Sequence, residues 1–244
     1  MSKSKLLYTR LSDTDKGIAI LIDPDKTHSE SAILQILKTL EAIKPSFIFV
    51  GGSQVDAHKM EQVLGYIKQN TTIPILIFPG SSEQVSDQAD GILFLSLISG
   101  RNPDYLIGHQ IESARRIYQS KLEAISTGYI LIDGGSESAV ARISNTRPLP
   151  QEKIETIEQI AMAASLLSHQ CIYLEAGSGA KNCVSAKIIS TVKQIGLPLI
   201  VGGGIRSIAE LKSAHEAGAN VVVIGNKIEE DARFLAEIKD YVQA

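Results

Sequence analysis

The stretch of sequence that decides the fold is Tyr173-Leu174-Glu175-Ala176-Gly177-Ser178-Gly179-Ala180, followed by Val201-Gly202-Gly203-Gly204-Ile205-Arg206 and Ile224-Gly225-Asn226. Each segment begins with an apolar run and ends in or passes through glycine and small polar residues. Turns of this composition expose backbone N–H groups, which bind phosphate oxygens. The segments recur roughly every 25 residues, a spacing typical of successive strand–loop–helix units. The sequence therefore predicts a phosphate-binding site at the end of a parallel barrel.

Apolar runs of the same kind occur along the whole chain, rich in Ile, Val and Leu and without alternating polar residues. This is the pattern of strands that are buried on both faces, as in parallel sheets. The runs are Gly17–Ile22, Phe47–Val50, Ile73–Phe78, Gly91–Leu95, Tyr129–Ile132, Ile172–Leu174, Leu197–Val201 and Val221–Ile224. Helical stretches lie between most of them, and the 244 residues suit one barrel of about 250. We predict an α/β fold, a (β/α)8 TIM barrel that forms a single domain over residues 1–244.

Two segments depart from the regular repeat. Ser81 to Ala89 alone separate the third and fourth predicted strands, which leaves room for at most about two helical turns. We therefore predict a degenerate third helix. The longest irregular segment runs from Asp133 to Pro150, after the fifth predicted strand. Loops of this length are often functional, and a mobile lid and a plain surface loop are equally open alternatives.

Composition excludes several classes of function. The net charge of −3 does not favour broad nucleic-acid binding, which needs a basic surface. Cys171 and Cys183 lack the spacing of a zinc site or a disulfide framework, and we expect Cys171 to be a buried thiol. The five histidines are expected to be structural or surface residues. No window reaches 18 apolar residues, and Met1–Lys5 does not lead into a signal-like apolar segment, so we expect no transmembrane segment and a cytoplasmic location.

Polar residues follow the first two predicted strands. Asp23 ends the first strand, and a carboxylate at the carboxyl end of a barrel strand faces the active-site mouth. One interpretation is a ligand of Mg²⁺, which takes one or two carboxylates together with substrate phosphates. The alternative is that Asp23 or Asp25 caps the following helix, the role we favour for Asp25. Gly51-Gly52-Ser53 ends the second strand, where the glycines permit a close backbone approach and Ser53 offers a hydroxyl beside the first strand.

The sixth predicted strand carries the residues most suited to catalysis. Glu175 stands in an otherwise apolar run, where a proton acceptor near a substrate hydroxyl and a structural salt bridge are the two alternatives. Tyr173 either places its hydroxyl in the site or packs inside the barrel. Gly177, Ser178 and Gly179 can form a nest of N–H groups, which the loops after the seventh and eighth strands complete in many barrels. Those two loops supply Gly203, Gly204, Gly225 and Asn226.

These motifs resemble those of the geranylgeranylglyceryl phosphate synthase family, and the similarity covers nearly the whole chain. The matching segments are Leu21–Lys26, Val50–Ser53, Ser99–Pro103, Tyr173–Gly179, Val201–Arg206 and Ile224–Asn226. The resemblance implies Mg²⁺ at Asp23 and Ser53. It implies sn-glycerol-1-phosphate held by Tyr173, Leu174, Glu175, Ala176, Gly177, Ser178, Gly179, Gly203, Gly204, Gly225 and Asn226. Some members carry a lysine at the position of Leu21, so this chain resembles the second subgroup, which includes bacterial members.

The resemblance also implies a reaction, a prenyl transfer in ether-lipid biosynthesis. The free hydroxyl of sn-glycerol-1-phosphate attacks the first carbon of a long allylic prenyl diphosphate, geranylgeranyl diphosphate above all, and pyrophosphate leaves. Glu175 and Tyr173 are the expected catalytic residues, and Mg²⁺ is the expected cofactor. We expect a homo-oligomer that binds no nucleic acid and contacts a membrane surface at most transiently, when it releases its product.

An apolar prenyl tail needs a long groove, and the surface beside the short third unit is the predicted place for it. An ordinary core between barrel and helix is the equal alternative for the same residues. The predicted groove residues are Phe94, Leu97, Ile98, Tyr105 and Leu106. Among them, Tyr105 is predicted to limit the depth of the groove.

Two other functions remain open on the residues alone. A phosphosugar isomerase or lyase would share the glycine loops and use Asp23 with Asp133, at the end of the fifth strand, as an acid–base pair. A catalytically silent phosphate-binding protein would need no intact set of Asp23, Ser53 and Glu175, so the presence of all three argues against it.

Overall fold

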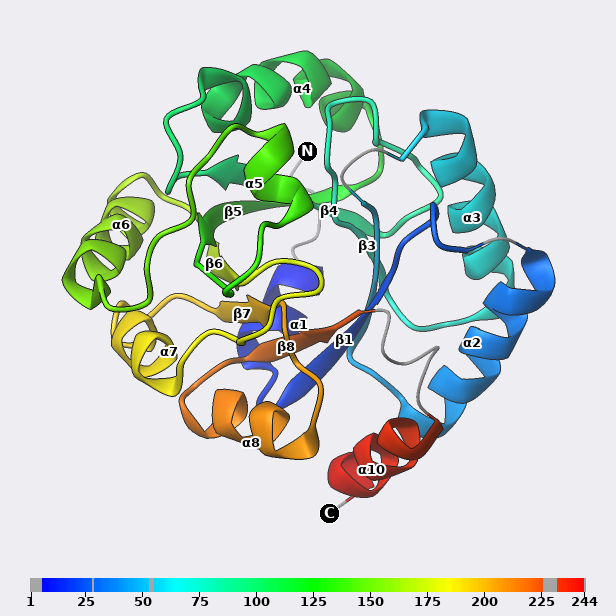
Figure 1. Cartoon of the computed structure of the whole chain (residues 1–244). Coiled ribbons are helices and arrows are strands. Elements are labelled where there is room, and N and C mark those ends of the chain that lie inside the picture. The colour runs from blue at the N-terminus through cyan, green and yellow to red at the C-terminus, as the bar shows by residue number, and fades with distance from the viewer. Residues whose placement is uncertain (1–5, 28, 53–54, 226–231, 244) are drawn as a thin grey trace.

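The computed structural model describes residues 6–27, 29–52, 55–225 and 232–243. Its centre is a closed barrel of parallel strands in chain order, in which each strand pairs with the next and β8 pairs with β1 (Figure 1). The strands are β1 (Gly17–Ile22), β2 (Phe47–Val50), β3 (Ile75–Ile77), β4 (Gly91–Leu97), β5 (Glu123–Leu131), β6 (Cys171–Glu175), β7 (Leu199–Gly202) and β8 (Val221–Ile224). The predicted (β/α)8 TIM barrel is thus confirmed.

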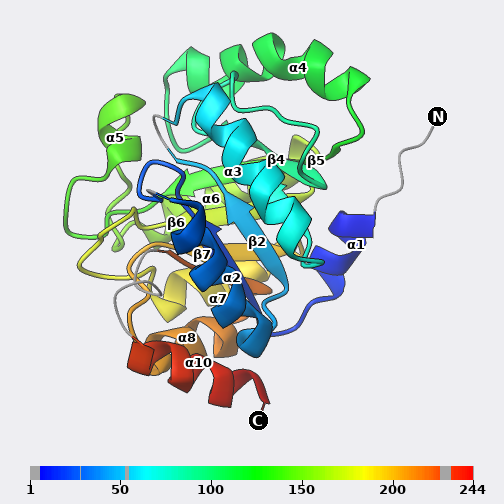
Figure 2. The same ribbon diagram turned by 90° about the vertical axis from the view of Figure 1, so that its right-hand side faces the viewer.

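Helices surround this barrel and cover most of its outer face (Figures 1 and 2). They are α1 (Leu6–Asp13), α2 (Glu30–Ile43), α3 (Ala57–Asn70), the π-helical η1 (Asp104–Gly108), α4 (His109–Gln119), α5 (Ala139–Ile143), α6 (Ile154–Leu166), α7 (Ala186–Lys193), α8 (Ile208–Glu216) and α10 (Ala232–Gln243). The cap expected at Asp25 is wrong. Ser29 caps α2 by accepting a first-turn N–H, and Asp25 pairs with Lys59 at 3.3 Å instead.

The third unit departs furthest from the regular repeat. The segment between β3 and β4 forms turns and contains no helix, so the predicted third helix is absent rather than degenerate. β3 begins at Ile75, later than predicted, because Pro74 has no N–H to donate to a ladder. β5 begins at Glu123, well before the predicted start at Tyr129, and pairs with every residue of β4. The connection from β3 to β4 therefore covers the barrel with turns alone.

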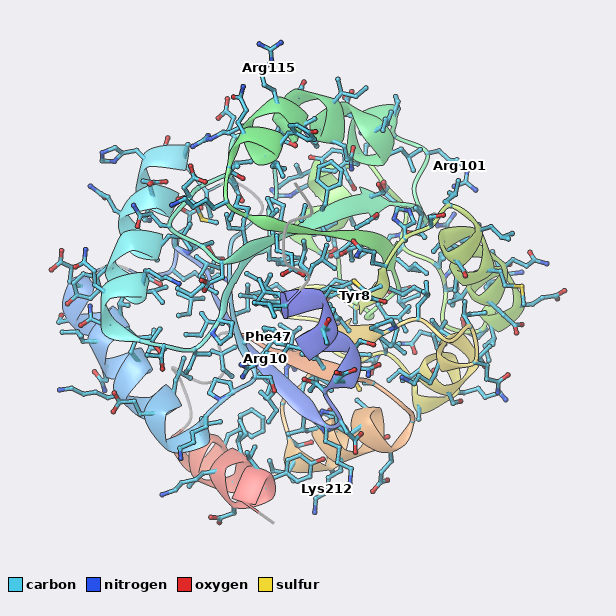
Figure 3. The ribbon with its side chains drawn as sticks, turned by 180° about the vertical axis from the view of Figure 1, so that it is seen from behind. Tyr8, Arg10, Phe47, Arg101, Arg115 and Lys212 are labelled. Carbon is cyan, nitrogen blue, oxygen red and sulfur yellow. The ribbon has the colours of Figure 1, made fainter. Side chains whose placement is uncertain are left out.

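The helix α1, which is not predicted from the sequence, closes the amino-terminal end of the barrel. The Glu123 carboxylate accepts the N–H groups of Leu7 and Tyr8, each at 2.8 Å, and so fixes the first turn of α1 to β5. The guanidinium of Arg10 lies 5.6 Å from the centroid of the Phe47 ring, at the base of β2 (Figure 3). This end of the barrel is therefore sealed, and substrates must enter at the other end.

The segment Asp133–Pro150 lies at that other end. It contains α5, and Leu149 pairs with Ile132 just after β5, which ties the end of the segment back to the barrel. Figure 2 shows α5 and α1 at opposite ends of the barrel. Three residues of α5 line the cavity described below. α5 therefore lies at the mouth of the barrel, and the movement of this segment as a lid stays a prediction.

Single residues expected to be structural also have that role. Cys171 is fully buried, and burial raises the pKa of its thiol to about 12, which confirms the buried thiol. The ring nitrogens of His215 contact the Tyr241 hydroxyl at 2.8 Å and the Gly17 carbonyl oxygen at 2.9 Å. Within the described ranges, none of the helices has the length and apolar character needed to cross a bilayer.

Candidate active site

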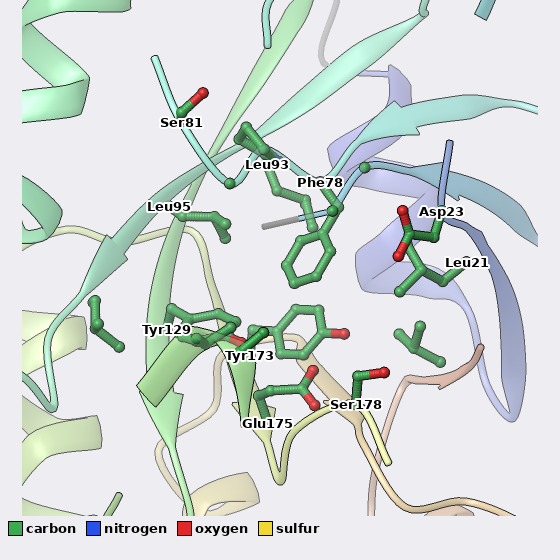
Figure 4. A pocket seen from close by; sticks show the side chains of 18 of the residues that line it. Leu21, Asp23, Phe78, Ser81, Leu93, Leu95, Tyr129, Tyr173, Glu175 and Ser178 are labelled. Atoms are coloured by element: carbon green, nitrogen blue, oxygen red, sulfur yellow. The ribbon is translucent and has the colours of Figure 1, made fainter. Parts of the chain in front are cut away.

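A cavity of about 750 Å³ opens at the carboxyl ends of the strands. One end is polar and lies among the loops that follow β1, β2, β6, β7 and β8, whereas the other end is apolar and extends between β4 and α4. Figure 4 shows Asp23 on one side of the polar end and Glu175 with Ser178 on the other, with the rings of Phe78 and Tyr173 between them. Predicted site residues from opposite sides of the barrel therefore share one cavity.

Glu175 is the last residue of β6 and is only 6% exposed. Its Oε1 accepts the N–H of Gly177 at 2.6 Å, and in the described part of the chain no basic side chain forms an ion pair with it. Burial raises the pKa of Glu175 to about 7, and the Gly177 N–H and the neighbouring Tyr173 hydroxyl offset only part of that rise. A carboxyl group that is partly ionised at neutral pH suits a proton acceptor better than a structural salt bridge.

Tyr173 combines the two alternatives left open for it. Its ring packs inside the barrel, stacked on Phe78 with ring centroids 5.1 Å apart and tilted against Tyr129 at 5.3 Å. Its hydroxyl lies beside the Glu175 carboxylate, buried and without a hydrogen-bond partner of normal geometry among the described residues. Burial, together with the charge of Glu175, raises the pKa of Tyr173 well above its usual value. The phenol thus stays neutral and can donate a hydrogen bond to a substrate oxygen.

The glycines after β7 make room for these same two side chains. A Cβ at Gly202 would lie 2.4 Å from the Tyr173 hydroxyl oxygen and 2.8 Å from Glu175 Oε2. A Cβ at Gly203 would lie 2.4 Å from Glu175 Oε1, and this residue also has a φ of +83°, which L side chains rarely adopt. Gly202 and Gly203 therefore position Tyr173 and Glu175, a role that is not predicted from the sequence.

The predicted phosphate loops meet at the polar end of the cavity. The residues of these loops that line it are Ser178, Gly179, Gly203, Gly204 and Gly225. A Cβ at Gly225 would meet no atom of the described residues within 4 Å, so none of them fills the space beside this glycine. Space that protein atoms leave empty beside glycine loops is what an anionic group requires.

Three described residues of the expected set, Gly177, Leu174 and Ala176, do not offer a group to the phosphate in the way expected. The N–H of Gly177 already donates to Glu175, so it is not available to a phosphate. The side chains of Leu174 and Ala176 pack in the core outside the barrel, because alternate residues of a strand face opposite sides. Asn226 lies outside the described residues.

Asp23 lies across the cavity from Glu175. Its Oδ1 accepts the N–H of Asp25 at 3.1 Å, and its Oδ2 lies 3.5 Å from Lys26 Nζ. A Cβ at Gly52 would lie 2.7 Å from Asp23 Oδ1, so the close approach expected at this glycine is confirmed. Ser53 lies outside the described residues. Asp23 and Asp25 both line the cavity, and carboxylate oxygens are the ligands that Mg²⁺ prefers when substrate phosphates complete its coordination.

The apolar end of the cavity occupies the space left by the missing helix between β3 and β4. The residues that line it include Val85, Ile92, Phe94, Ser113 and Ile117. Of the predicted groove residues, the cavity is lined by Phe94, Leu97 and Tyr105, but not by Ile98 and Leu106. A groove for an apolar chain is therefore present on the predicted side of the barrel.

The floor of this groove is not where it was predicted. The cavity continues past Tyr105 to Ile117, about three turns further along the helix. Tyr105 is therefore a wall of the groove, and the prediction that it limits the depth is wrong. His109 also lines the groove, edge-on to Tyr105 with ring centroids 4.8 Å apart. Among the described histidines it is the exception to the expectation of structural or surface roles, and His28 lies outside the described residues.

The cavity is also lined by two basic side chains that were not predicted to be site residues. Lys26 and Arg206 line it, and Arg206 Nη2 donates to the carbonyl oxygen of Gly179 at 3.2 Å. Both residues could have been found from the sequence, because each is the last residue of a matching segment, Leu21–Lys26 or Val201–Arg206. Asp133 is exposed, accepts the N–H of Gly135 at 2.8 Å and does not line the cavity. The acid–base pair of the isomerase or lyase alternative is therefore not assembled.

Residues 14–242 match the model of the PcrB family. The chain belongs to this family. It is 49% identical to the geranylgeranylglyceryl phosphate synthase of Zunongwangia profunda, over 88% of this chain and 91% of that one, and 48% identical to that of Flavobacterium johnsoniae, over 90% of each. The resemblance to geranylgeranylglyceryl phosphate synthases, with bacterial members among them, is thereby confirmed.

Solved structures agree with this membership of the PcrB family. The chain superposes with a TM-score of 0.90 on the crystal structure of (S)-3-O-geranylgeranylglyceryl phosphate synthase from Thermoplasma acidophilum in complex with its substrate sn-glycerol-1-phosphate. The two share 31% sequence identity, over 100% of this chain and 98% of that one. The orotidine 5′-phosphate decarboxylase of Pyrococcus horikoshii, at 12% identity and a TM-score of 0.59, shares the barrel fold alone with this PcrB-family chain.

Proposed function

We propose that the protein is a Mg²⁺-dependent geranylgeranylglyceryl phosphate synthase. It joins sn-glycerol-1-phosphate to a long allylic prenyl diphosphate, geranylgeranyl diphosphate above all, through an ether bond and releases pyrophosphate. The observation that carries this proposal is the single cavity, whose polar end at Glu175 and the glycine loops continues into an apolar groove under α4. A phosphosugar isomerase needs no such groove. The named relatives support the same activity.

The polar end binds and orients the glycerol phosphate. Its phosphate lies against the loops at Ser178–Gly179, Gly203–Gly204 and Gly225, where backbone N–H groups are the expected donors. Arg206, bonded to the Gly179 carbonyl, adds a positive charge beside these loops. The free hydroxyl of the glycerol then points toward Glu175. Holding two reacting groups in this arrangement removes much of the entropic part of the barrier.

Glu175 accepts the proton of the attacking hydroxyl. The glycerol oxygen forms a bond to the first carbon of the prenyl chain, the bond from that carbon to the diphosphate breaks, and its electron pair leaves with the pyrophosphate. A pKa of about 7 makes the carboxylate basic enough to take the proton and still ionised in part at neutral pH. The buried Tyr173 hydroxyl donates a hydrogen bond to the glycerol moiety and fixes it beside the acceptor.

Asp23 and Ser53 are the residues that would hold Mg²⁺. When bound, Mg²⁺ neutralises the charge that develops on the departing diphosphate. The position of Asp23 in the cavity wall, opposite Glu175, supports this assignment. The chain itself contributes the Asp23 carboxylate, which lies beside the position that the diphosphate must take if the prenyl tail is to enter the groove.

The proposal extends to the protein's setting in the cell. We expect a cytoplasmic homo-oligomer of a single catalytic domain that contacts a membrane surface transiently to release its lipid product. Large apolar side chains on α4 and α6 are exposed, among them Ile111 and Leu166, and they support contacts of this kind. Light scattering on the purified protein and sedimentation with vesicles would measure the two properties separately.

The decisive experiment is a product assay. The protein is incubated with Mg²⁺, with each enantiomer of glycerol phosphate, and with prenyl diphosphates of several lengths, and the lipid fraction is examined by mass spectrometry. We expect a prenyl ether from the sn-1 enantiomer and a long prenyl diphosphate, and no ether when Mg²⁺ is removed with a chelator. The absence of ether from every combination would refute the proposed function.

A further inference from the structure

The proposed reaction brings a phosphate and a diphosphate into one cavity. Among the described residues that line this cavity, a basic side chain lies near the expected position of each group. Arg206 adjoins the glycine loops after β6 and β7. Lys26 lies on the opposite side, after β1, where its Nζ is 3.5 Å from Asp23 Oδ2. The reaction described above assigns no role to Lys26.

The turn after β1 holds Lys26 at the cavity wall. The N–H of Lys26 donates to the Asp23 carbonyl oxygen at 3.0 Å, and the Thr27 hydroxyl donates to the same oxygen at 2.9 Å. The N–H of Asp25 donates to Asp23 Oδ1. The backbone is thus fixed on both sides of the side chain. The Lys26 side chain is itself 45% exposed, so its ammonium group can leave Asp23 for a ligand at little cost in desolvation.

Each carboxylate of the turn has a lysine beside it, and the two pairs differ in their place. Asp25, the second carboxylate of the turn, is paired with Lys59 at 3.3 Å, and Lys59 does not line the cavity. The contact between Lys26 and Asp23 is too long for a good hydrogen bond and is partly exposed, so it is a weak interaction. An ammonium group binds phosphate oxygens as a compact point charge with several donors.

We propose that Lys26 binds the diphosphate of the prenyl substrate and retains the leaving pyrophosphate. This inference rests on the proposed function. When the bond from the prenyl carbon to the diphosphate breaks, the electron pair and its negative charge stay on the pyrophosphate oxygen. The ammonium group of Lys26 donates N–H bonds to that oxygen or to its neighbours on the same group. Lys26 exchanges its weak contact with Asp23 for a stronger one with the leaving group.

The test uses inorganic pyrophosphate as the probe, titrated by calorimetry into the full-length protein with and without Mg²⁺. Lys26→Ala should weaken pyrophosphate binding about tenfold and leave the affinity for sn-glycerol-1-phosphate unchanged. Lys26→Arg keeps the charge and should restore most of the binding. Lys38→Ala removes the same charge from an exposed side chain of α2 that does not line the cavity, so this matched control should change the affinity less than about twofold.

Product inhibition provides an independent readout. In steady-state assays, the inhibition constant of pyrophosphate should rise in Lys26→Ala by the same factor as the dissociation constant. Parental pyrophosphate affinity in Lys26→Ala, or an equal loss for pyrophosphate and sn-glycerol-1-phosphate, would overturn the inference. A parent protein that forms no ether, but whose pyrophosphate affinity still falls in Lys26→Ala, would refute the proposed function and leave the anion site standing.

Discussion

Glu175 has to be ionised before it can take a proton, and its surroundings oppose ionisation. Because burial raises its pKa to about 7, kcat/KM should rise as the pH increases through about 7 and level off above it. Glu175→Gln keeps the shape of the side chain and removes the base, so it should lower kcat by about 10²- to 10⁴-fold and flatten the profile. A pH series of steady-state rates on both proteins measures this. A flat parental profile across neutral pH would contradict the assignment of Glu175 as the proton acceptor.

On the proposed function, Asp23 is expected to act on the prenyl diphosphate, because it lies on the opposite side of the cavity from Glu175 (Figure 4). Asp23→Asn keeps the size of the side chain but removes the charge that attracts Mg²⁺. Turnover should therefore fall about tenfold or more, while the affinity for sn-glycerol-1-phosphate is unchanged. Rates at limiting Mg²⁺ and calorimetry with the glycerol phosphate measure the two effects. Parental turnover at limiting Mg²⁺ would show that Asp23 is not a metal ligand.

Gly225 offers the cleanest probe of the phosphate site. Among the described residues, a Cβ at this position meets no atom within 4 Å, whereas a Cβ at Gly204 would lie 3.0 Å from the backbone of Asn182, at a φ of +75°. Gly225→Ala should therefore leave the melting temperature unchanged and weaken sn-glycerol-1-phosphate binding about tenfold, since the methyl group enters the space of the phosphate. Calorimetry and thermal unfolding of the same sample give both values. Unchanged binding would place the phosphate elsewhere.

At the scale of elements, the missing helix between β3 and β4 should decide which tails the protein accepts. Ser113 is buried on the inner face of α4 and lines the groove, and its neighbour Ala114 is exposed on the outer face. Ser113→Phe fills the groove and should shift the preference toward shorter prenyl diphosphates, because each methylene left unburied costs about 0.8 kcal/mol, or roughly fourfold in kcat/KM. A series of prenyl lengths measures the preference.

Ala114→Phe is the matched control, since it adds the same ring to the solvent side of the same helix. It should keep the parental length preference. If Ser113→Phe also keeps that preference, the tail does not run under α4, and the apolar end of the cavity is core packing with an internal void.

The elements that could be predicted from the sequence are those whose pattern is local. Strands such as β1 and β8 are uninterrupted apolar runs, and the structure has them at the predicted bounds. The first half of β5 was missed because Ser126, Thr127 and Gly128 interrupt the run, although Thr127 is fully buried. α1 was missed because its apolar residues contact the barrel floor, which is formed by distant parts of the chain.

In the candidate site, too, the residues that could be predicted are those with a local sequence pattern. Glu175 and Asp23 could be predicted, because each is a polar residue at the end of an apolar strand. The depth of the groove could not, since it depends on a helix that is absent and on the face that α4 turns inward. The role of Gly202 and Gly203 could not be predicted either, because the space they leave is occupied by side chains of β6. Distances across the barrel are properties of the fold rather than of any segment.

The stability of the whole molecule should also depend on the ionisation of Glu175. Its pKa is about 7 in the folded protein against an ordinary value of 4.5, so the folded state binds more protons than the unfolded state between these pH values. The free energy of unfolding should therefore decrease as the pH rises through this window, by about 3 kcal/mol in total, with the full contribution present below about 4.5.

Chemical denaturation near both ends of the window, on the parent and on Glu175→Gln, measures this effect. The neutral amide cannot ionise, so the variant should lack this part of the pH dependence. The free energy of unfolding of the variant, measured relative to that of the parent, should therefore be higher at the alkaline end of the window than at the acid end. An equal difference between parent and variant at both pH values would show that the carboxyl ionises as readily in the folded state as in the unfolded one.

The groove under α4 lies apart from the polar end of the cavity. The length of the prenyl tail and the chemistry at its head can therefore change independently in evolution. On the proposed function, the head of the prenyl substrate reacts among loops of the barrel, whereas its tail extends between β4 and α4, beside the turns that join β3 to β4. A substitution such as one at Ser113 alters the tail without touching the closed ladder of strands or the reacting atoms. We therefore expect single substitutions along this groove to lengthen or shorten the lipid that a lineage makes, and with it the thickness of the bilayer.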